Sequence, residues 1–335
     1  MKTIEKLNHL RDLMKKNRID AYIIPSSDPH ISEYLPDYWK SRSWISGFTG
    51  SAGTVVVTQK KAALWADSRY FLQAEKELAG SGIDLCKMGL PETPSMEAWL
   101  ISQLKNGDVV GFDGNVFQTT SAKSLMETLQ KSKIKSNPNL NLISPIWDKR
   151  PKPPKGKAFI QELKYTGKSV SEKLTEVRKV MQQKGATAYI ICALDEVCWL
   201  FNIRGNDIDF NPVVLSYGYI DNEKAILFID TEKIDEHIAN ELIEQGVSLK
   251  KYCKVEKQLR KLGKHDSIFV DPSKINYFLY SAIPCKVKKI EGIGIVTELK
   301  AQKNSIELES IRNAMIEDGI AMVEFLSWFG SNIGK

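Results

Sequence analysis

Hydrophobic and polar positions follow the same order in two long stretches of the chain, residues 3–143 and 170–299. Each stretch opens with apolar residues three and four positions apart, which is typical of one face of a helix. Each continues with the same apolar run, AYII, at residues 21–24 and again at residues 188–191. A repeat of this length is too long for a solenoid unit, so it predicts one globular domain that has been duplicated.

The first copy also contains two apolar runs that lie close together. TVVVT at residues 54–58 and AALWA at residues 62–66 are separated by three polar residues, which is typical of an antiparallel hairpin. A hairpin inside an otherwise alternating β/α order predicts a mixed sheet with helices on its faces. The expected fold class is therefore α/β, with two tandem domains that each hold a mixed β-sheet covered by helices on both faces.

A proline-rich and basic segment, SPIWDKRPKPPKGK at residues 144–157, separates the two copies. Its four prolines are incompatible with a continuous helix or central strand, so it is the expected interdomain linker. We therefore place the first domain at residues 1–150, the second at 151–300 and a third segment at 301–335.

The third segment is predicted to form one long helix over residues 305–329. Asn304 and Glu307 have the spacing of a capping box at its start. Its apolar positions form a broad stripe made of Leu308, Ile311, Met315, Ile316, Ile320, Met322, Val323, Leu326 and Phe329. A lone terminal helix cannot bury so broad a face, so we expect it to pack on the second domain or on another copy of the chain. We also expect it to open a further domain.

Composition narrows the functional class. The chain is 42% hydrophobic and 26% charged, as in ordinary globular proteins, and no apolar run approaches the ~20 residues of a membrane span. The net charge of +6 comes from lysines spread over both copies, without the concentrated basic face of a nucleic-acid-binding protein. The five cysteines lack a CxxC pair and fit a reducing compartment. We expect a cytoplasmic protein that binds neither nucleic acid nor membrane.

Two motifs suggest chemistry that their context does not support. The glycine-rich segment 47–53, GFTGSAG, precedes a strand, whereas a phosphate-binding loop follows a strand and opens a helix. This order favours a sharp bend with a close backbone approach. His30 and Glu33 have HxxE spacing, but no second histidine follows at metal-ligand distance, so zinc is not expected. The residues themselves therefore indicate no catalytic group and no metal ligand.

Arg69 follows Trp65-Ala66-Asp67-Ser68 at a predicted junction between a strand and a helix. Asp67 either caps the helix and pairs with Arg69, or fixes a guanidinium that binds a substrate carboxylate. Another charged loop is residues 202–212, NIRGNDIDFNP, in which Arg204 and Asp207 stand where the first copy has uncharged residues. This divergence indicates that the two copies do different things at that loop.

Four segments in sequence order resemble those of one known family. They are SSDPHISEYLPDYWKSRSWISGFTGSAGTVVVT, LWADSRYFLQAEKEL, PIWDKRP and LDEVCWLFNIRGNDIDFNPVVLSY. Together they resemble the N-terminal part of the three-domain Xaa-Pro aminopeptidases, whose N-terminal domains are of the creatinase/prolidase type.

The resemblance implies removal of an N-terminal residue that precedes proline. In this family a C-terminal domain of pita-bread fold holds two metal ions, usually manganese, through two Asp, one His and two Glu, and a bridging hydroxide attacks the peptide. Helix 305–329 resembles the first helix of that domain, so we expect the metal ligands beyond Lys335. On this basis the chain by itself carries no cofactor and no catalytic residue, and residues 1–335 alone are expected to be inactive.

Matching the segments makes His30, Glu33, Arg69, Arg204 and Asp207 the expected cleft-lining or domain-interface residues. The partners implied are short peptides with proline in second position and a second copy of the chain in a homodimer. The competing hypothesis is a stand-alone, non-catalytic binding or dimerisation module. A different enzyme of the creatinase/prolidase group is less favoured, because those chains lack a duplicated middle domain.

Overall fold

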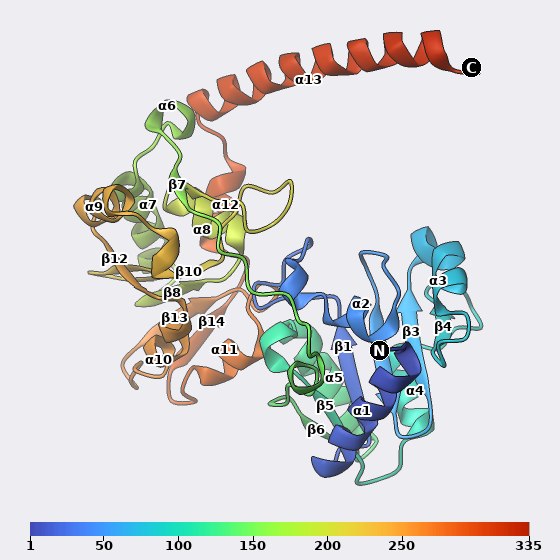
Figure 1. Ribbon diagram of the computed structural model, residues 1–335. Coiled ribbons are helices and arrows are strands. Elements are labelled where there is room, and N and C mark those ends of the chain that lie inside the picture. Colours follow the sequence, from blue (N-terminus) through green and yellow to red (C-terminus); the bar gives the residue numbers. More distant parts are fainter. Residues whose placement is uncertain (335) are drawn as a thin grey trace.

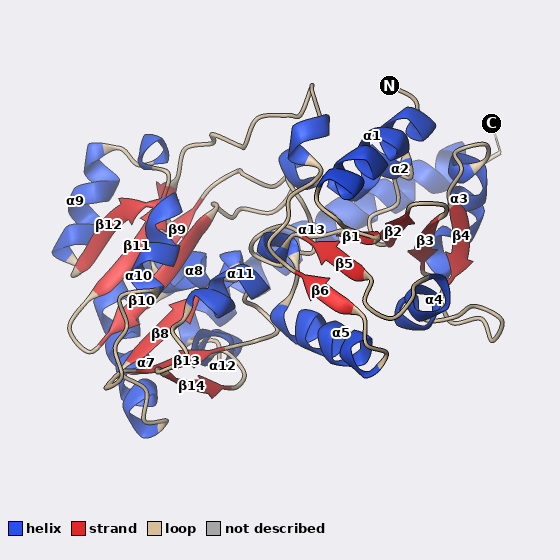
Figure 2. Cartoon of the chain, turned by 90° about the horizontal axis from the view of Figure 1, so that it is seen from below, coloured by secondary structure: helices blue, strands red, loops and turns tan. Residues whose placement is uncertain are grey.

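The computed structural model describes residues 1–334 of the chain. Two lobes, each built on a six-stranded sheet, lie side by side, and a long helix extends away from the second lobe (Figure 1). Figure 2 shows the two sheets as separate bodies, each flanked by its own helices.

The first sheet has the strand order β4-β3-β2-β1-β5-β6. Its strands are β1 Ala21–Pro25, β2 Thr54–Thr58, β3 Ala62–Ala66, β4 Asp84–Lys87, β5 Val109–Phe112 and β6 Lys135–Asn137. β1 runs antiparallel to β2 and parallel to β5, and β2 and β3 form the predicted antiparallel hairpin. The sheet is therefore mixed, as predicted.

Helices cover both faces of this sheet. They are α1 Thr3–Lys16, α2 Ser41–Ser46, α3 Phe71–Leu78, α4 Met96–Gln103 and α5 Thr119–Lys131. Alternate residues of β1 point to opposite faces, as strand geometry requires. Tyr22 and Ile24 join the core that contains Leu10 of α1, whereas Ile23 joins the core that contains Leu125 of α5.

The second sheet repeats the first, in the order β12-β11-β10-β8-β13-β14. Its strands are β8 Ala188–Ile191, β10 Ser216–Asp221, β11 Ala225–Ile229, β12 Val247–Lys251, β13 Ser267–Val270 and β14 Lys288–Glu291. β8 takes the place of β1, since it is antiparallel to β10 and parallel to β13. The predicted α/β fold with two tandem mixed sheets is confirmed.

Around the second sheet lie α7 Val170–Gln183, α8 Leu194–Leu200, α9 Glu236–Glu244, α10 Val255–Leu259, α11 Tyr277–Ala282 and α12 Ile295–Ala301. A short ribbon of β7 Phe159–Ile160 and β9 Ile203–Arg204, with α6 Leu163–Thr166, follows the linker. Single 3₁₀ turns occur at η1 Asp37–Trp39, η2 Ser68–Tyr70, η3 Gly114–Val116, η4 Ser144–Ile146, η5 Thr231–Lys233 and η6 Tyr252–Lys254.

The two lobes meet directly as well as through the linker. Thr119 donates to the carbonyl of Ile275 through both its backbone N–H and its hydroxyl, at 3.1 and 2.9 Å. The backbone N–H of Tyr277 donates to Phe117 O at 2.8 Å, and Gln118 and Asn276 form an isolated bridge. These contacts join the start of α5 to the start of α11.

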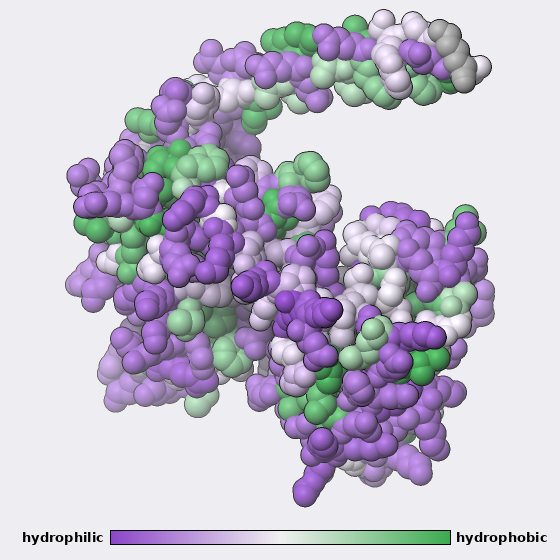
Figure 3. Space-filling model, in the orientation of Figure 1, coloured by the Kyte–Doolittle hydropathy of each residue, from purple (hydrophilic) through white to green (hydrophobic). Residues whose placement is uncertain are grey.

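The last helix, α13 Ser305–Asn332, starts with the predicted capping box. None of its residues is buried; Val323, for example, is 67% exposed. We expected packing on the second domain or on another copy, and within the described residues only the first turn contacts the second domain. Phe325, Leu326, Trp328 and Phe329 in its second half are exposed large apolar residues. Figure 3 shows hydrophobic as well as hydrophilic residues along the visible face of this helix. No described helix is apolar enough over its length to span a bilayer.

Candidate functional site

A cleft of about 700 Å³ lies between the two domains. Three segments form it: loop 26–51 of the first domain, the linker around residues 151–154, and loop 206–210 of the second domain. This volume is within the range of sites for small molecules. Its apolar lining is made of Tyr34, Leu35, Pro36, Trp39, Pro151, Pro154, Ile208 and Phe210. Its charged lining is made of Glu33, Asp37, Lys40, Arg42, Lys152, Asp207 and Asp209.

Arg42 holds the wall from the first domain together. It lies on α2, which is capped at its C-terminal end by Gly47 with a φ of 78°, a conformation that favours glycine. The Arg42 side chain donates from Nε to Ser26 Oγ at 2.8 Å, from Nη1 to Phe48 O at 2.5 Å and from Nη2 to Gly50 O. One guanidinium therefore connects the beginning of the loop to its glycine-rich end.

The glycine-rich segment makes the close approach that its sequence favours. A Cβ on Gly50 would lie 2.3 Å from the ring of Phe48 and 2.8 Å from the ring of Tyr70. Only glycine fits there, because no real Cβ tolerates such distances. The segment leads into β2 and not into a helix, so it lacks the helix N-terminus of a phosphate-binding loop.

The positive charge of Arg42 is buried without a counter-ion. The residue is 4% exposed, and no carboxylate of residues 1–334 pairs with it. Burial lowers its pKa to about 10, so the guanidinium remains protonated at neutral pH. Its Cζ lies 4.8 Å from the ring centroid of Phe48, which gives partial compensation through a cation–π contact.

Asp207 holds the wall from the second domain. Its Oδ2 accepts from the backbone N–H of Leu215 at 2.7 Å and from Lys233 Nζ, in an ion pair whose side chains are 0% and 3% exposed. Its Oδ1 has no hydrogen-bond partner among the described residues. The loop carries Phe210 at its tip, fully exposed and with a φ of 59°. A buried ion pair therefore supports a loop that presents an aromatic ring to solvent.

Glu33 and Asp207, two of the residues expected from the sequence, lie in this cleft. Glu33 is exposed and makes neither a hydrogen bond nor an ion pair within residues 1–334, so its carboxylate is available to a ligand. Arg204 lies behind the cleft, where its Nη1 donates to Cys198 O at 2.9 Å and to Ile203 O at 2.8 Å. Burial lowers the pKa of Arg204, and its role there is to fix the start of the loop.

Arg69 does not line the cleft. It is paired with Asp67 at 2.8 Å, and Asp67 also accepts from the backbone N–H of Arg69 at 3.1 Å. Asp67 therefore caps the turn η2 and pairs with Arg69, and hydrogen bonding to Arg69 lowers the pKa of the Asp67 carboxyl. The neighbouring Tyr70 reaches the cleft indirectly, through a 2.6 Å hydrogen bond between its hydroxyl and that of Ser51.

His30 lies in the interface between the domains and is 1% exposed. Its Nδ1 is 2.8 Å from the carbonyl of Cys192, and its Nε2 is 2.7 Å from the hydroxyl of Tyr252. Because a carbonyl only accepts, Nδ1 carries the proton and a neutral ring accepts at Nε2 from Tyr252. Burial lowers the pKa of His30, although the nearby Asp28 opposes the shift. Tyr217 packs on the imidazole at 4.3 Å between ring centroids.

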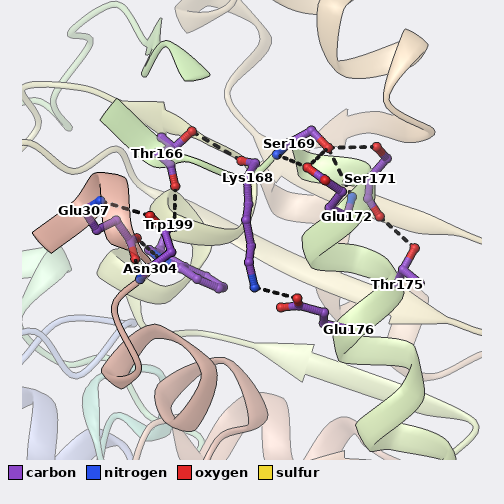
Figure 4. A network of polar contacts seen from close by, with 10 residues as sticks. All are labelled: Thr166, Lys168, Ser169, Ser171, Glu172, Thr175, Glu176, Trp199, Asn304 and Glu307. Atoms are coloured by element: carbon purple, nitrogen blue, oxygen red, sulfur yellow. Dashed lines mark hydrogen bonds and ion pairs between the residues drawn. The ribbon is translucent and has the colours of Figure 1, made fainter. Parts of the chain in front are cut away.

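A second polar network anchors α13 to the second domain (Figure 4). Asn304 donates from Nδ2 to Thr166 O at 2.8 Å, and Trp199 donates from Nε1 to Glu307 Oε1 at 2.9 Å. Under Trp199 lies the ammonium of Lys173, which donates to Trp199 O at 2.8 Å and whose pKa burial lowers to about 8. The first turn of α13 is thereby fixed, while the rest of the helix is uncovered.

Sequence reasoning did not identify Arg42, Lys173 or Phe210. Nothing in the sequence around Arg42 predicts that its side chain is buried. Lys173 is a charged residue in a predicted helix, which indicates a position exposed to solvent. The signal that was available is the close sequence neighbourhood of Arg42 and the glycine-rich segment. A bend that brings backbone carbonyls together requires donors, and arginine supplies five.

The described residues do not fit a metal centre. Among residues 1–334, no group of three or more His, Cys, Asp or Glu side chains is placed to hold a metal ion. The arrangement in the cleft therefore supports binding and orientation of a polar, partly apolar ligand.

Two family models match the chain, and both describe a creatinase/prolidase N-terminal domain. One matches residues 6–142 and the other matches residues 149–307. The matches cover the two lobes one after the other, as expected for a duplicated domain.

The chain is also similar to proteins named as Xaa-Pro aminopeptidases. The probable Xaa-Pro aminopeptidase P of Botryotinia fuckeliana is 38% identical over 341 residues, which is 97% of this chain and 51% of that protein. The corresponding protein of Talaromyces marneffei is 38% identical, over 99% of this chain and 52% of its own length. The chain spans about half the length of the curated relatives it matches.

Among solved structures, the X-prolyl aminopeptidase of Caenorhabditis elegans superposes on the whole chain with a TM-score of 0.94 and 32% sequence identity. The match covers 57% of that protein, which is described as a cytosolic enzyme with a di-nuclear active site.

Proposed function

The chain belongs to the family of creatinase/prolidase N-terminal domains, and from this premise we propose that it is the N-terminal, two-domain part of an Xaa-Pro aminopeptidase. The observation that carries the proposal is the likeness, over the whole chain, to an X-prolyl aminopeptidase with a TM-score of 0.94. The proposed reaction is release of the N-terminal residue from short peptides with proline in second position.

In this proposal the two domains bind and limit the peptide. The cleft supports this role, because aromatic and proline side chains line it together with charges of both signs. Apolar walls with a few polar groups are typical of sites that orient a small ligand. Glu33 and Asp209 have no ion pair within the described residues, so they suit a peptide ammonium.

We propose that α13 continues into the domain that carries out the chemistry. Its apolar faces are uncovered, and the relatives are about twice as long as this chain. Together α13 and loop 206–210 extend on the same side of the molecule in Figure 1, which suits a domain that covers both. Phe210, which is fully exposed at the tip of the loop, suits a contact with that domain.

Two manganese ions are part of the proposal, and they would be held by residues outside this chain. When bound, such ions supply an activated water and stabilise the developing oxyanion. The residues described here contribute peptide binding, orientation and the shape of the cleft. We further propose that the protein forms a homodimer and is cytoplasmic; the cytosolic character stated for the related enzyme supports the proposed compartment.

A direct experiment compares residues 1–335 with the full-length protein. The full-length protein loaded with Mn²⁺ is expected to hydrolyse Ala-Pro-Ala, whereas residues 1–335 are expected to bind the peptide in calorimetry without cleaving it. Hydrolysis by purified residues 1–335 would contradict the assignment of the chemistry to another domain.

The role of the cleft is tested with a variant that fills it. Asn206 lines the cleft and is exposed, so N206W is expected to block binding without disturbing the core. The matched control is E244W on the exposed side of α9, which is expected to bind as the unmodified chain does. Equal affinity of the two variants would rule out this cleft as the peptide site.

The alternative function is a stand-alone binding or dimerisation module. The observation that favours it is the cleft of about 700 Å³ between the two domains, which is formed by residues of this chain alone. Reading the coding frame past Lys335 separates the two proposals. A continuation that carries Asp, Asp, His, Glu and Glu in that order supports the peptidase, and a stop codon supports the binding module.

A further inference from the structure

We propose that Arg42 is the centre of a carboxylate-binding subsite within the cleft. The inference rests on the proposed function, because it names the part of a peptide that the cleft recognises. The ligand group is a carboxylate, and the first candidate source is the free C-terminus of a short peptide.

The donor count of Arg42 leaves part of the guanidinium unused. A guanidinium has five N–H groups, and three of them donate to Ser26 Oγ, Phe48 O and Gly50 O. One N–H on Nη1 and one on Nη2 have no partner within the described residues. Two N–H groups on adjacent nitrogens match the two oxygens of a carboxylate, which is the bidentate geometry that arginine favours.

The positive charge of Arg42 also lacks a partner within the described residues. A buried cation without a counter-ion is unfavourable, and proteins normally pair such a group. The nearest acidic influence on Arg42 comes from Glu77, which raises its pKa without pairing with it. Glu77 is already engaged by the backbone N–H of Thr49 at 2.8 Å and its hydroxyl at 2.7 Å. A ligand carboxylate in the cleft supplies the counter-charge that the protein does not.

The remaining charges of the cleft favour a carboxylate over a phosphate. Glu33, Asp209 and Lys152 line the same cavity without ion-pair partners among the described residues, and because the two free carboxylates outnumber the one free ammonium, they repel an anion with two negative charges more strongly than one with a single charge. The same two acidic groups attract an ammonium. A cavity with a cation on one wall and free carboxylates elsewhere therefore fits a zwitterion, such as a short peptide with both ends free.

The test is calorimetric titration of residues 1–335 with three peptides. Ala-Pro-Ala carries a C-terminal carboxylate, Ala-Pro-Ala-amide carries none, and Ala-Pro-Glu-amide carries one only in its side chain. We expect the free acid to bind about tenfold or more tightly than the amide, as loss of a charge-assisted hydrogen bond implies. Restored binding by the glutamate amide would identify an acidic side chain as a second source of the carboxylate. Inorganic phosphate is expected not to compete.

Substitution of Arg42 itself tests the site but also removes the bonds that hold the loop. The decisive variants are therefore S43D and S43N, because Ser43 lines the cleft and its side chain makes no hydrogen bond in the described structure. S43D places a negative charge in the cleft, whereas S43N has the same shape and is neutral, so S43N controls for the added volume. We expect S43D to bind the free acid about tenfold more weakly than S43N does, and we expect a smaller difference between the two variants for the amide.

The outcomes separate this inference from the proposed function. If the free acid and the amide bind the unmodified chain equally, or if S43D and S43N behave alike toward the free acid, the carboxylate subsite is wrong while the peptide cleft stands. If neither peptide binds, both are wrong. Competition by phosphate at the same affinity as the free acid would show a general anion site and would also overturn the inference.

Discussion

Replacing Lys233 by methionine tests whether a buried ion pair supports the loop at the cleft. Lys233 Nζ donates to Asp207 Oδ2, and both side chains are almost completely excluded from solvent. Methionine keeps most of the apolar stem of lysine but removes the charge. Asp207 would then be a buried carboxylate with the Leu215 N–H as its single donor.

The magnitude follows from these contacts. Removal of one partner of a buried ion pair destabilises by about 3–5 kcal/mol, because the other charge stays buried without compensation. Because Asp207 keeps its hydrogen bond from Leu215, we expect K233M to lower the free energy of unfolding by about 3 kcal/mol, near the lower end of this range. The double variant D207N/K233M removes the charge as well, and an amide oxygen can still accept from Leu215. The free energy of unfolding of the double variant is therefore expected to be about 1–2 kcal/mol higher than that of K233M.

The assay is urea unfolding followed by tryptophan fluorescence and circular dichroism. The matched control is K155M, because Lys155 pairs with Glu232 at 2.9 Å on the surface, where both side chains are well exposed. An exposed ion pair contributes little to the stability of the folded state, so K155M is expected to unfold at the same urea concentration as the unmodified chain. The reasoning is refuted if K233M shifts the unfolding transition no more than K155M, or if the double variant is less stable than K233M.

Three further predictions concern other parts of the molecule. Burial lowers the pKa of His30 in the folded state, so the unfolded state binds more protons and the free energy of unfolding is expected to fall as pH drops below about 6.5. In H30Q, urea unfolding at pH 7.5 and at pH 5.5 should show a smaller loss of stability at the lower pH than in the unmodified chain. An equal loss in both proteins would contradict this prediction. G50A is expected to destabilise by about 1–3 kcal/mol in thermal unfolding, because its Cβ would overlap the ring of Phe48; an unchanged melting temperature would contradict the close approach. W199F removes the donor to Glu307 and should speed amide exchange in the first turn of α13, with exchange in α1 as the internal control.

Much of the fold could be predicted because it depends on patterns that are local in sequence. The AYII runs became the equivalent strands β1 and β8, and the close pair of apolar runs became the β2–β3 hairpin. Both follow from the burial of apolar side chains at the period of a strand. The capping box at Asn304 was equally local and formed as expected.

The packing of α13 could not be predicted in the same way. Its broad apolar face indicated a partner, and we expected the second domain among the candidates. The structure anchors only the first turn, through Asn304 and Glu307, and leaves the rest uncovered. An apolar face shows that burial is favourable, but the direction of the helix is set by the anchor at its start, which pairs residues more than a hundred positions apart.

The structure places the five residues chosen from the sequence in different surroundings. Glu33 and Asp207 lie in the cleft, His30 lies in the interface beneath it, and Arg204 supports the loop. These residues were chosen through a family resemblance, and their individual roles follow from contacts that sequence does not display. Arg69 is an example, because its guanidinium pairs with Asp67 and the residue is not among those that line the cavity.

The sequence by itself determined the duplicated domains, the mixed order of their strands and the family, because helix and strand periodicity and ordered motifs are properties of the chain alone. Only the tertiary structure decided that Arg42 is buried without a counter-ion, that His30 is a neutral bridge between domains, and that a cavity of about 700 Å³ lies between them. The physical reason is that charge compensation, desolvation and cavity shape depend on atoms brought together from distant segments. The same arginine on an exposed helix would be an ordinary solvated cation.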